Sequence, residues 1–121
     1  MSKFKAKKTL IDGIWFDSKK EAMRYRELKK MEEEGLITDL QLQVEYELLP
    51  AQREPDKIGP RGGTIKGKVI ERKCSYIADF VYIDHTINDI IVEDVKGVHT
   101  KEYLIKRKMM LAFHGIRIKE V

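Results

Sequence analysis

The sequence has one cysteine, three prolines, three histidines and one tryptophan among its 121 residues. Cys74 has no second cysteine to pair with, so we interpret it as a buried thiol in a reducing compartment. The histidines share no metal-ligand spacing, which argues against a histidine-based metal centre. No apolar run is long enough to span a membrane, and the opening residues MSKFKAKK lack the apolar segment of a secretory signal. These absences predict a cytoplasmic protein without a membrane partner.

The length and the apolar content predict a single domain over residues 1–121. Hydrophobic residues make up 42% of the chain, which is enough for one modest core. Neither a disulfide nor a structural metal is needed to hold a core of this size.

Charge is distributed in segments. The formal net charge is +4 and the sequence pI is about 9.1. Basic residues gather at the N-terminus (Lys3, Lys5, Lys7 and Lys8), between residues 51 and 73, and after residue 100, whereas acidic residues concentrate at 32–34 and 84–94. This segregation indicates a polyanionic partner, although charge alone leaves a merely solvated surface as the alternative.

The first third of the chain carries clear signals for a hairpin and a helix. Asp12-Gly13 stands between two short apolar runs and predicts a hairpin at residues 8–17, because glycine accepts a positive φ. Ser18 is a suitable N-cap and Gly35 a suitable C-terminal residue, so a helix is predicted between them.

The middle of the chain changes from a regular pattern to an irregular one. Apolar residues alternate with polar ones and predict a half-buried strand with a single apolar face, made by Leu40, Leu42, Val44, Tyr46 and Leu48. From about residue 50 to 68 the chain is rich in proline, glycine and basic residues, which predicts a long mobile basic loop.

The C-terminal half predicts a strand–helix–strand unit after a second hairpin. The expected order is a strand at 69–83, a turn at 84–89, a strand at 90–96, a helix from about 101 to 114 between Thr100 and Gly115, and a strand at 116–121. The last two strands should pair in parallel. The expected fold class is therefore α/β or α+β, with a mixed sheet flanked by helices and an N-terminal hairpin.

Two acidic residues occupy strands that otherwise suit a core. If the turn is centred between Thr86 and Ile87, Asp79 lies directly opposite Asp94, whereas a register shift of one residue would separate them. Opposed carboxylates repel each other, so a shared proton or a bound cation must offset the repulsion. A hard cation such as Mg²⁺ takes oxygen ligands of this kind.

Lys96 follows Asp94 by two residues and therefore shares its face, roughly 7 Å further along the strand. Its ammonium group can reach a phosphate oxygen or a water molecule held at the same point. A plain Asp94–Lys96 surface ion pair is the alternative. By the same alternation, Glu93 and Val95 point to the opposite face, unless a bulge exchanges Glu93 with Asp94.

Glu21 has two possible roles. It can complete a capping box with Ser18, or it can ligate a metal, because helical spacing places it beside Tyr25 and Leu28 on the stripe that should face the sheet. Both roles remain open at this point.

Taken together, these segments resemble a known superfamily. FDSKKEAMRYRELKKMEEEG, LQLQVEYEL, YIADFVY and VEDVKG, followed by a lysine-rich helix, resemble the PD-(D/E)XK nuclease superfamily from Phe16 to the C-terminus. More narrowly, the chain resembles small endonucleases encoded by bacteriophages and prophages, the endonuclease subunit of Tn7-type transposition and, more distantly, Holliday-junction resolvases. One departure is that Ala78 stands where the motif has proline.

The resemblance implies a restriction-endonuclease-like core and a metal-dependent DNA endonuclease of the host cytoplasm that acts in recombination, repair or the processing of branched DNA. By position it implies that the catalytic residues are Glu21, Asp79, Asp94 and Lys96. Mg²⁺ or Mn²⁺ would be held by Asp79, Asp94, Glu21 and the backbone carbonyl of Val95. Lys96 would position water and stabilise developing charge.

The expected partner is duplex or branched DNA. The residues expected to bind its phosphates are Arg53, Arg61, Lys66, Lys68, Lys101, Lys106 and Lys108. A chain of this size covers one scissile phosphate, so a homodimer is expected for cutting both strands. Two alternatives are a non-catalytic nucleic-acid-binding module and an endonuclease subunit that depends on a protein partner for targeting.

Overall fold

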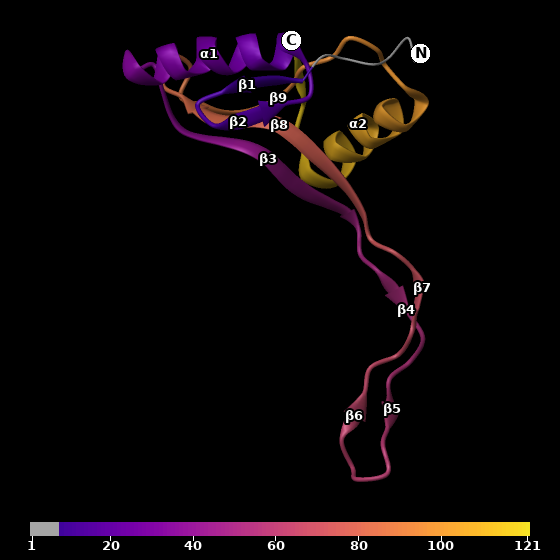
Figure 1. Cartoon of the computed structure of the whole chain (residues 1–121). Coiled ribbons are helices and arrows are strands. Elements are labelled where there is room, and N and C mark those ends of the chain that lie inside the picture. The colour runs from indigo at the N-terminus through magenta and orange to yellow at the C-terminus, as the bar shows by residue number, and fades with distance from the viewer. Residues whose placement is uncertain (1–7) are drawn as a thin grey trace.

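The computed structural model of the chain describes residues 8–121, and Lys3, Lys5 and Lys7 lie outside this range. The described part comprises two helices, a four-stranded sheet, an N-terminal hairpin and a long arm that projects from the core (Figure 1). The elements are β1 (Thr9–Ile11), β2 (Ile14–Phe16), α1 (Lys19–Glu33), β3 (Ile37–Leu49), β4 (Gln52–Arg53), β5 (Lys57–Ile58), β6 (Thr64–Ile65), β7 (Val69–Glu71), β8 (Cys74–Asp84), β9 (Asp89–Asp94), α2 (Lys101–His114) and β10 (Lys119–Glu120).

The central sheet is mixed, with the strand order β10-β9-β8-β3. Strand β8 pairs antiparallel with both β3 and β9, while β10 pairs parallel with β9. The predicted strand–helix–strand unit is therefore confirmed, and the fold is α+β. The β8–β9 turn is centred where the sequence predicts, because Asp84 pairs with Asp89 and Phe80 with Glu93.

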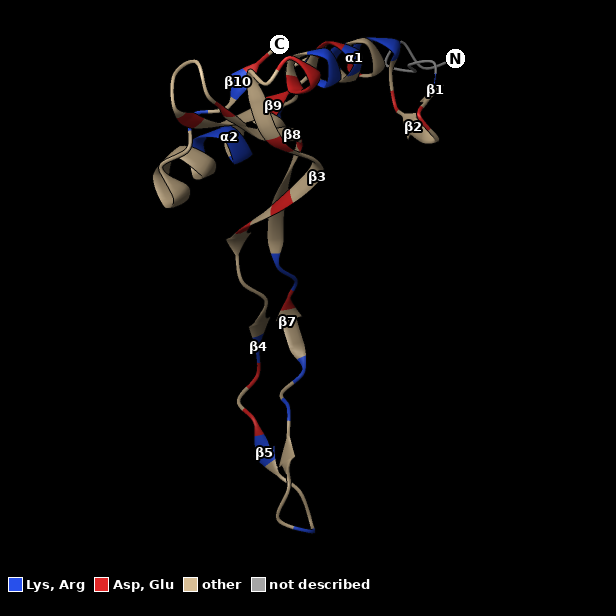
Figure 2. Ribbon diagram, turned by 90° about the vertical axis from the view of Figure 1, so that its left-hand side faces the viewer, with Lys and Arg blue, Asp and Glu red and all other residues tan. Residues whose placement is uncertain are grey.

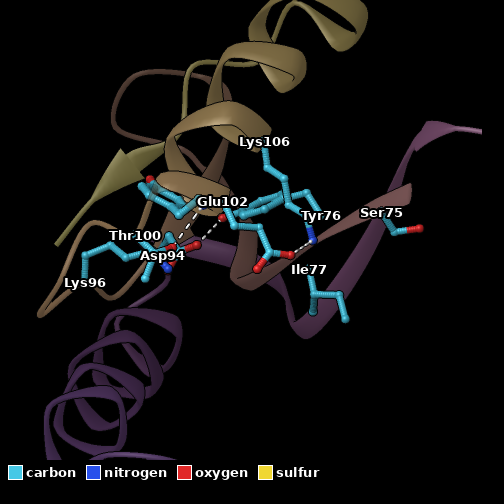
Figure 3. Close-up of a pocket in the computed structure, with 9 residues that line it drawn as sticks. Ser75, Tyr76, Ile77, Asp94, Lys96, Thr100, Glu102 and Lys106 are labelled. Atoms are coloured by element: carbon cyan, nitrogen blue, oxygen red, sulfur yellow. Dashed lines mark hydrogen bonds and ion pairs between the residues drawn. The ribbon is translucent and has the colours of Figure 1, made fainter. Parts of the chain in front are cut away.

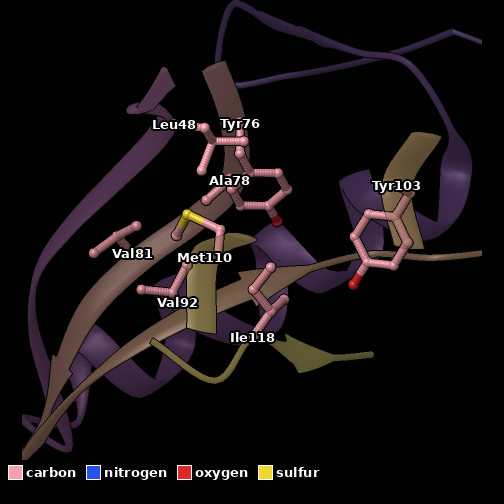
Figure 4. Close-up of a cluster of buried hydrophobic side chains, with 8 residues drawn as sticks. All are labelled: Leu48, Tyr76, Ala78, Val81, Val92, Tyr103, Met110 and Ile118. Atoms are coloured by element: carbon pink, nitrogen blue, oxygen red, sulfur yellow. The ribbon is translucent and has the colours of Figure 1, made fainter. Parts of the chain in front are cut away.

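The two helices cover opposite faces of the sheet, each over its own apolar cluster. In β9, Ile91 packs against the cluster under α1 and its neighbour Val92 belongs to the cluster under α2, as strand alternation requires. The α1 cluster contains Phe16, Ala22, Tyr25, Leu28, Ile37, Phe80 and Tyr82. The α2 cluster contains Leu48, Tyr76, Ala78, Val81, Val92, Tyr103, Met110 and Ile118 (Figure 4).

The prediction that residues 40–48 present one apolar face is wrong, because β3 changes face at Gln43. Leu42 packs against the α1 cluster, whereas Val44 packs against the α2 cluster. Gln43 has a φ of 52°, a left-handed conformation that rotates the chain between these two neighbours. The partner strand β8 changes cluster at the matching place, between Ala78 and Phe80. In both strands, therefore, the backbone twists at the same level of the sheet, and side chains before and after this level face different apolar clusters.

Both helices begin and end as predicted. The Ser18 side chain accepts a hydrogen bond from the Glu21 N–H at 3.1 Å, and the Thr100 side chain accepts one from the Tyr103 N–H at 3.1 Å. Just beyond the helices, Gly35 has φ 77° and Gly115 has φ 66°, the left-handed conformation that ends a helix.

The segment predicted as a mobile loop is instead paired into an arm. Strand β4 pairs with β7 and β5 with β6, so the chain leaves the core along β3 and returns along β8 as a two-stranded ribbon (Figure 1). Composition alone indicated a loop because glycine and proline are typical of turns. Here Gly67 instead allows the two strands to approach closely: a side-chain carbon at this position would lie 1.7 Å from the Glu54 carbonyl oxygen.

The N-terminal hairpin is confirmed. Strands β1 and β2 pair antiparallel around Asp12 and Gly13, both of which have positive φ. Within residues 8–121 no helix combines the length and the apolar character needed to cross a membrane.

Candidate functional site

Four elements bring polar side chains to the level of the sheet where β3 and β8 twist. Glu21 comes from the first turn of α1, Asp79 from β8, Asp94 from the end of β9 and Gln43 from β3. The β8–β9 register, continued by one residue beyond the Phe80–Glu93 pair, places Asp79 opposite Asp94. Asp79 closes this end of the ladder, because its Oδ2 accepts a hydrogen bond from the Val95 N–H at 2.9 Å.

Gln43 joins two of the three carboxylates. Its Nε2 donates to Glu21 Oε1 at 3.1 Å and to Asp79 Oδ1 at 3.3 Å. Glu21 therefore faces the site, and the Ser18 cap is made by the Glu21 backbone N–H. Sequence reasoning missed Gln43, because a polar residue between Leu42 and Val44 has the pattern of an ordinary solvent-facing strand residue.

Two of the three carboxylates have raised pKa values. Burial, together with the charges of Asp79, Asp17 and Asp94, raises the pKa of Glu21 to about 7. Burial also raises the pKa of Asp79 to about 6, and the charge of Asp94 adds to this effect, while the Val95 N–H and Gln43 oppose it.

Asp94 and Lys96 are held by two tyrosines beside a pocket. Asp94 is 3% exposed, and its Oδ2 accepts a hydrogen bond from the Tyr76 hydroxyl. Lys96 Nζ lies 3.1 Å from Asp94 Oδ1 and 4.0 Å from the centroid of the Tyr103 ring. The pocket has a volume of about 290 Å³, and Lys106 and Thr100 also line it (Figure 3). The Asp94–Lys96 ion pair is present, but it is partly buried at the mouth of a pocket.

Glu93 lies on the other face, as strand alternation predicts. It is 0% exposed, and Arg24 of α1 donates to both of its carboxylate oxygens, at 2.8 and 2.7 Å. The Tyr82 hydroxyl also donates to it. Arg24 lies three residues after Glu21, so this bidentate pair fixes α1 against β9 next to the three carboxylates.

The chemistry of this donor set fits a hard divalent cation, since it offers oxygen ligands and excess negative charge. The spacing is wider than that of a closed metal centre: within residues 8–121, no three His, Cys, Asp or Glu side chains lie close enough to hold a metal ion. The Gln43 amide lies between Glu21 and Asp79. A cation held by these two carboxylates would compete with the Gln43 amide for their oxygens.

The residues expected to bind DNA fall into two groups. Arg53, Arg61, Lys66 and Lys68 lie on the arm, and Lys101, Lys106 and Lys108 lie on α2. Two of them have contacts within the protein: Arg53 donates to the Gly67 carbonyl at 3.0 Å, and Lys106 Nζ lies 3.1 Å from Glu102 Oε1. The structure thus brings only Lys106 to the pocket that contains Asp94 and Lys96.

The raised pKa of Glu21 predicts how the stability of the metal-free protein depends on pH. The folded protein keeps a proton on Glu21 up to about pH 7, whereas the unfolded chain releases it near pH 4.5. Raising the pH from 5 to 8 in EDTA should therefore lower the free energy of unfolding by about 2 kcal/mol through this residue. Urea unfolding at both pH values measures the change.

The matched variants for this measurement are Glu21→Gln and Glu33→Gln. Glu33 is exposed near the end of the same helix, so Glu33→Gln should keep the full decrease, while Glu21→Gln should lose most of it. A decrease of the same size in Glu21→Gln would contradict the assignment. In the wild type at pH 8, Mg²⁺ should restore the lost stability, because a cation neutralises the same charges.

The family model described as "Protein of unknown function (DUF1064)" matches residues 1–120. No curated protein and no solved structure matches the chain.

Proposed function

We propose that this chain, which belongs to the DUF1064 family of proteins of unknown function, is a metal-dependent DNA endonuclease. The observation that carries the proposal is that Glu21, Asp79 and Asp94, from three different elements, lie near enough for their charges to raise the pKa values of Glu21 and Asp79, with Lys96 paired to Asp94. The likeness to the PD-(D/E)XK superfamily, with a restriction-endonuclease-like core, is part of this proposal. So are a role in recombination, repair or the processing of branched DNA and a place in the host cytoplasm.

In this proposal, Asp79, Asp94 and Glu21 hold Mg²⁺ or Mn²⁺, and the Val95 carbonyl is a further ligand. The ion, when bound, makes a water molecule more acidic and neutralises charge on the phosphate. Lys96 then donates hydrogen bonds to the attacking water or to a non-bridging phosphate oxygen. The Tyr103 ring and Asp94 hold the lysine ammonium in place for this role.

In this proposal DNA is held by basic residues of α2 and of the arm. Lys106 stands at the pocket itself, with Lys101 and Lys108 exposed on the same helix. The arm contributes Arg61, Lys66 and Lys68, all exposed. These phosphate contacts make the affinity sensitive to salt and largely independent of sequence. Cutting both strands requires two copies of the chain, each acting on one scissile phosphate.

One observation favours a second candidate, an endonuclease subunit that depends on a partner. The Gln43 amide donates to one oxygen of Glu21 and one oxygen of Asp79, two of the carboxylates that would hold a cation. A subunit in which the DNA or a protein partner moves this amide would cut only when correctly targeted. A non-catalytic binding module leaves the buried acidic cluster unexplained.

Incubation with plasmid, branched and linear duplex DNA tests the proposal. We expect nicking of at least one substrate with Mg²⁺ or Mn²⁺ and none with EDTA. Asp94→Asn should lose the activity, because it removes a charge from the cation site. Nicking that persists in EDTA would contradict a metal-dependent reaction. Binding of DNA without metal-dependent nicking on any substrate would favour the binding module.

A further inference from the structure

We infer that the arm formed by residues 50–73 enters the major groove of duplex DNA tip first. This inference rests on the proposed function in taking DNA as the substrate, and it specifies how the duplex is held. The arm is the one large feature of the described chain that the core does not explain, since its strands pair only with each other (Figure 1).

The arm has a defined shape. Arg53 donates to the Gly67 carbonyl at 3.0 Å, and the Gly67 N–H donates to Asp56 Oδ1 at 2.8 Å. The Glu54 N–H donates to the Lys68 carbonyl at 2.8 Å. These bonds cross the ribbon between its two ladders, so they fix the outer part relative to the inner part.

The turn at the tip is equally specific. The Gly59 N–H donates to the Gly63 carbonyl at 2.7 Å, and the Gly62 N–H donates to the Gly59 carbonyl at 3.0 Å. Arg61 lies within this turn at the farthest point of the arm. A run from residue 52 to residue 61 covers at most about 30 Å at a strand rise of about 3.3 Å per residue, which is longer than the depth of the major groove, about 8.5 Å.

The arm carries apolar as well as basic side chains on its surface. Exposure of the apolar side chains to water is energetically unfavourable. Ile58 is 82% exposed and Ile65 is 53% exposed. Ile58 pairs with Thr64 and Ile65 with Lys57, and paired residues share a face, so each face near the tip carries one isoleucine. An isolated two-stranded ribbon is marginally stable at best, so these side chains imply a bound partner.

The charge of the arm indicates which kind of partner it binds. Basic residues lie along both strands, and Figure 2 shows one further short blue segment in the turn at the far end. One of the acidic residues, Asp56, is already bonded within the arm. Two arms from two copies would repel each other, whereas a polyanion would not. The major groove of undistorted DNA, about 12 Å wide, admits a two-stranded ribbon, whereas the minor groove, about 6 Å wide, must be widened at a cost in deformation energy before it can take one.

In the groove, the two faces of the ribbon meet the two walls. Lys66 and Lys68 then reach phosphates, the isoleucines contact sugars and apolar base edges, and Arg61 at the tip reaches the floor. An arginine there bonds to N7 and O6 of guanine. The arm would therefore favour duplex over single-stranded DNA of the same length.

The test uses the full chain in EDTA, so that no cleavage is involved. Gly67→Ala forces a side-chain carbon against the Glu54 carbonyl and should disrupt the arm, while Gly97→Ala, which lies outside the arm and has no atom within 4 Å, is the matched control. We expect Gly67→Ala to lose at least tenfold in affinity for a 30-base-pair duplex and Gly97→Ala less than twofold. Premethylation of the duplex with dimethyl sulfate should interfere with wild-type binding at guanine N7, in the major groove, and not at adenine N3, in the minor groove.

A second set of variants keeps the arm backbone intact. The triple variant Arg61→Ala, Lys66→Ala, Lys68→Ala should reduce the slope of log affinity against log salt by about 2–3. Equal affinity of wild type and Gly67→Ala, interference at adenine N3, or an unchanged salt slope would overturn the inference. So would a DNA-free dimer that Gly67→Ala dissociates, because the arm would then bind a second copy. If the wild type bound in the major groove but cut no DNA substrate, the proposed function would be contradicted and this inference would still hold.

Discussion

Replacing Lys96 with alanine is expected to slow single-turnover DNA cleavage by about 10²- to 10³-fold while changing DNA affinity less than twofold. Lys96 is the cation that the structure places against the acidic cluster, 3.1 Å from Asp94 Oδ1 and over the Tyr103 ring. Phosphate contacts from the arm and from α2 do not depend on it, so binding should persist. Cleavage at saturating protein with Mg²⁺ and binding in EDTA measure the two quantities separately.

Two further variants make this result specific. Lys30→Ala removes an exposed lysine at the end of α1 and should change neither quantity. Lys96→Arg keeps the charge but not the compact ammonium, and it should recover only part of the rate. If Lys96→Ala lost cleavage and affinity to the same extent, or unfolded at lower urea, the lysine would have a structural role and the catalytic assignment would fall.

Local signals predicted the fold well wherever a single residue determines the backbone. Gly35, Thr100 and Gly115 mark the ends of helices at the positions that the structure shows. The register of β8 and β9 follows from the short turn between them, since antiparallel strands joined by a turn have little freedom to slip. Thus the opposition of Asp79 and Asp94 could be predicted from sequence.

The parts that could not be predicted depend on contacts between distant residues. Alternation in β3 is regular through Gln43, and only its left-handed backbone sends Leu42 and Val44 to different clusters. Nothing local distinguishes such a residue from its neighbours. The Gln43 contacts with Glu21 and Asp79 depend on the same twist.

The ordered structure of the arm also could not be predicted from the sequence. Its composition is that of a loop, because glycine and proline are frequent where strands are not expected. The pairing depends on a fit between Gly67 and the Glu54 carbonyl, thirteen residues apart in sequence, that composition does not report. A glycine-rich basic segment can therefore be an ordered ribbon when its glycines permit close approach of two backbones.

Replacing Arg24 with methionine is expected to lower the free energy of unfolding by about 3–5 kcal/mol. Glu93 is fully buried, and Arg24 donates to both of its oxygens. Without Arg24, the Tyr82 hydroxyl remains as a donor to a buried carboxylate. Urea unfolding at pH 7 measures the loss. Lys29→Met is the control, because it breaks a partly exposed ion pair with Glu32 on the same helix and should have a much smaller effect.

The double variant Arg24→Met, Glu93→Leu separates the buried charge from the rest of the interaction. It should recover part of the lost stability, because an apolar pair of similar size carries no unpaired charge, but the buried Tyr82 hydroxyl loses its acceptor. It should not recover cleavage fully, since the bidentate pair also orients α1, and Glu21 lies three residues before Arg24 on that helix. If Arg24→Met lost no more stability than Lys29→Met, the burial of Glu93 would not depend on its ion pair with Arg24. Full recovery of both stability and cleavage in the double variant would show that α1 is positioned by apolar packing alone.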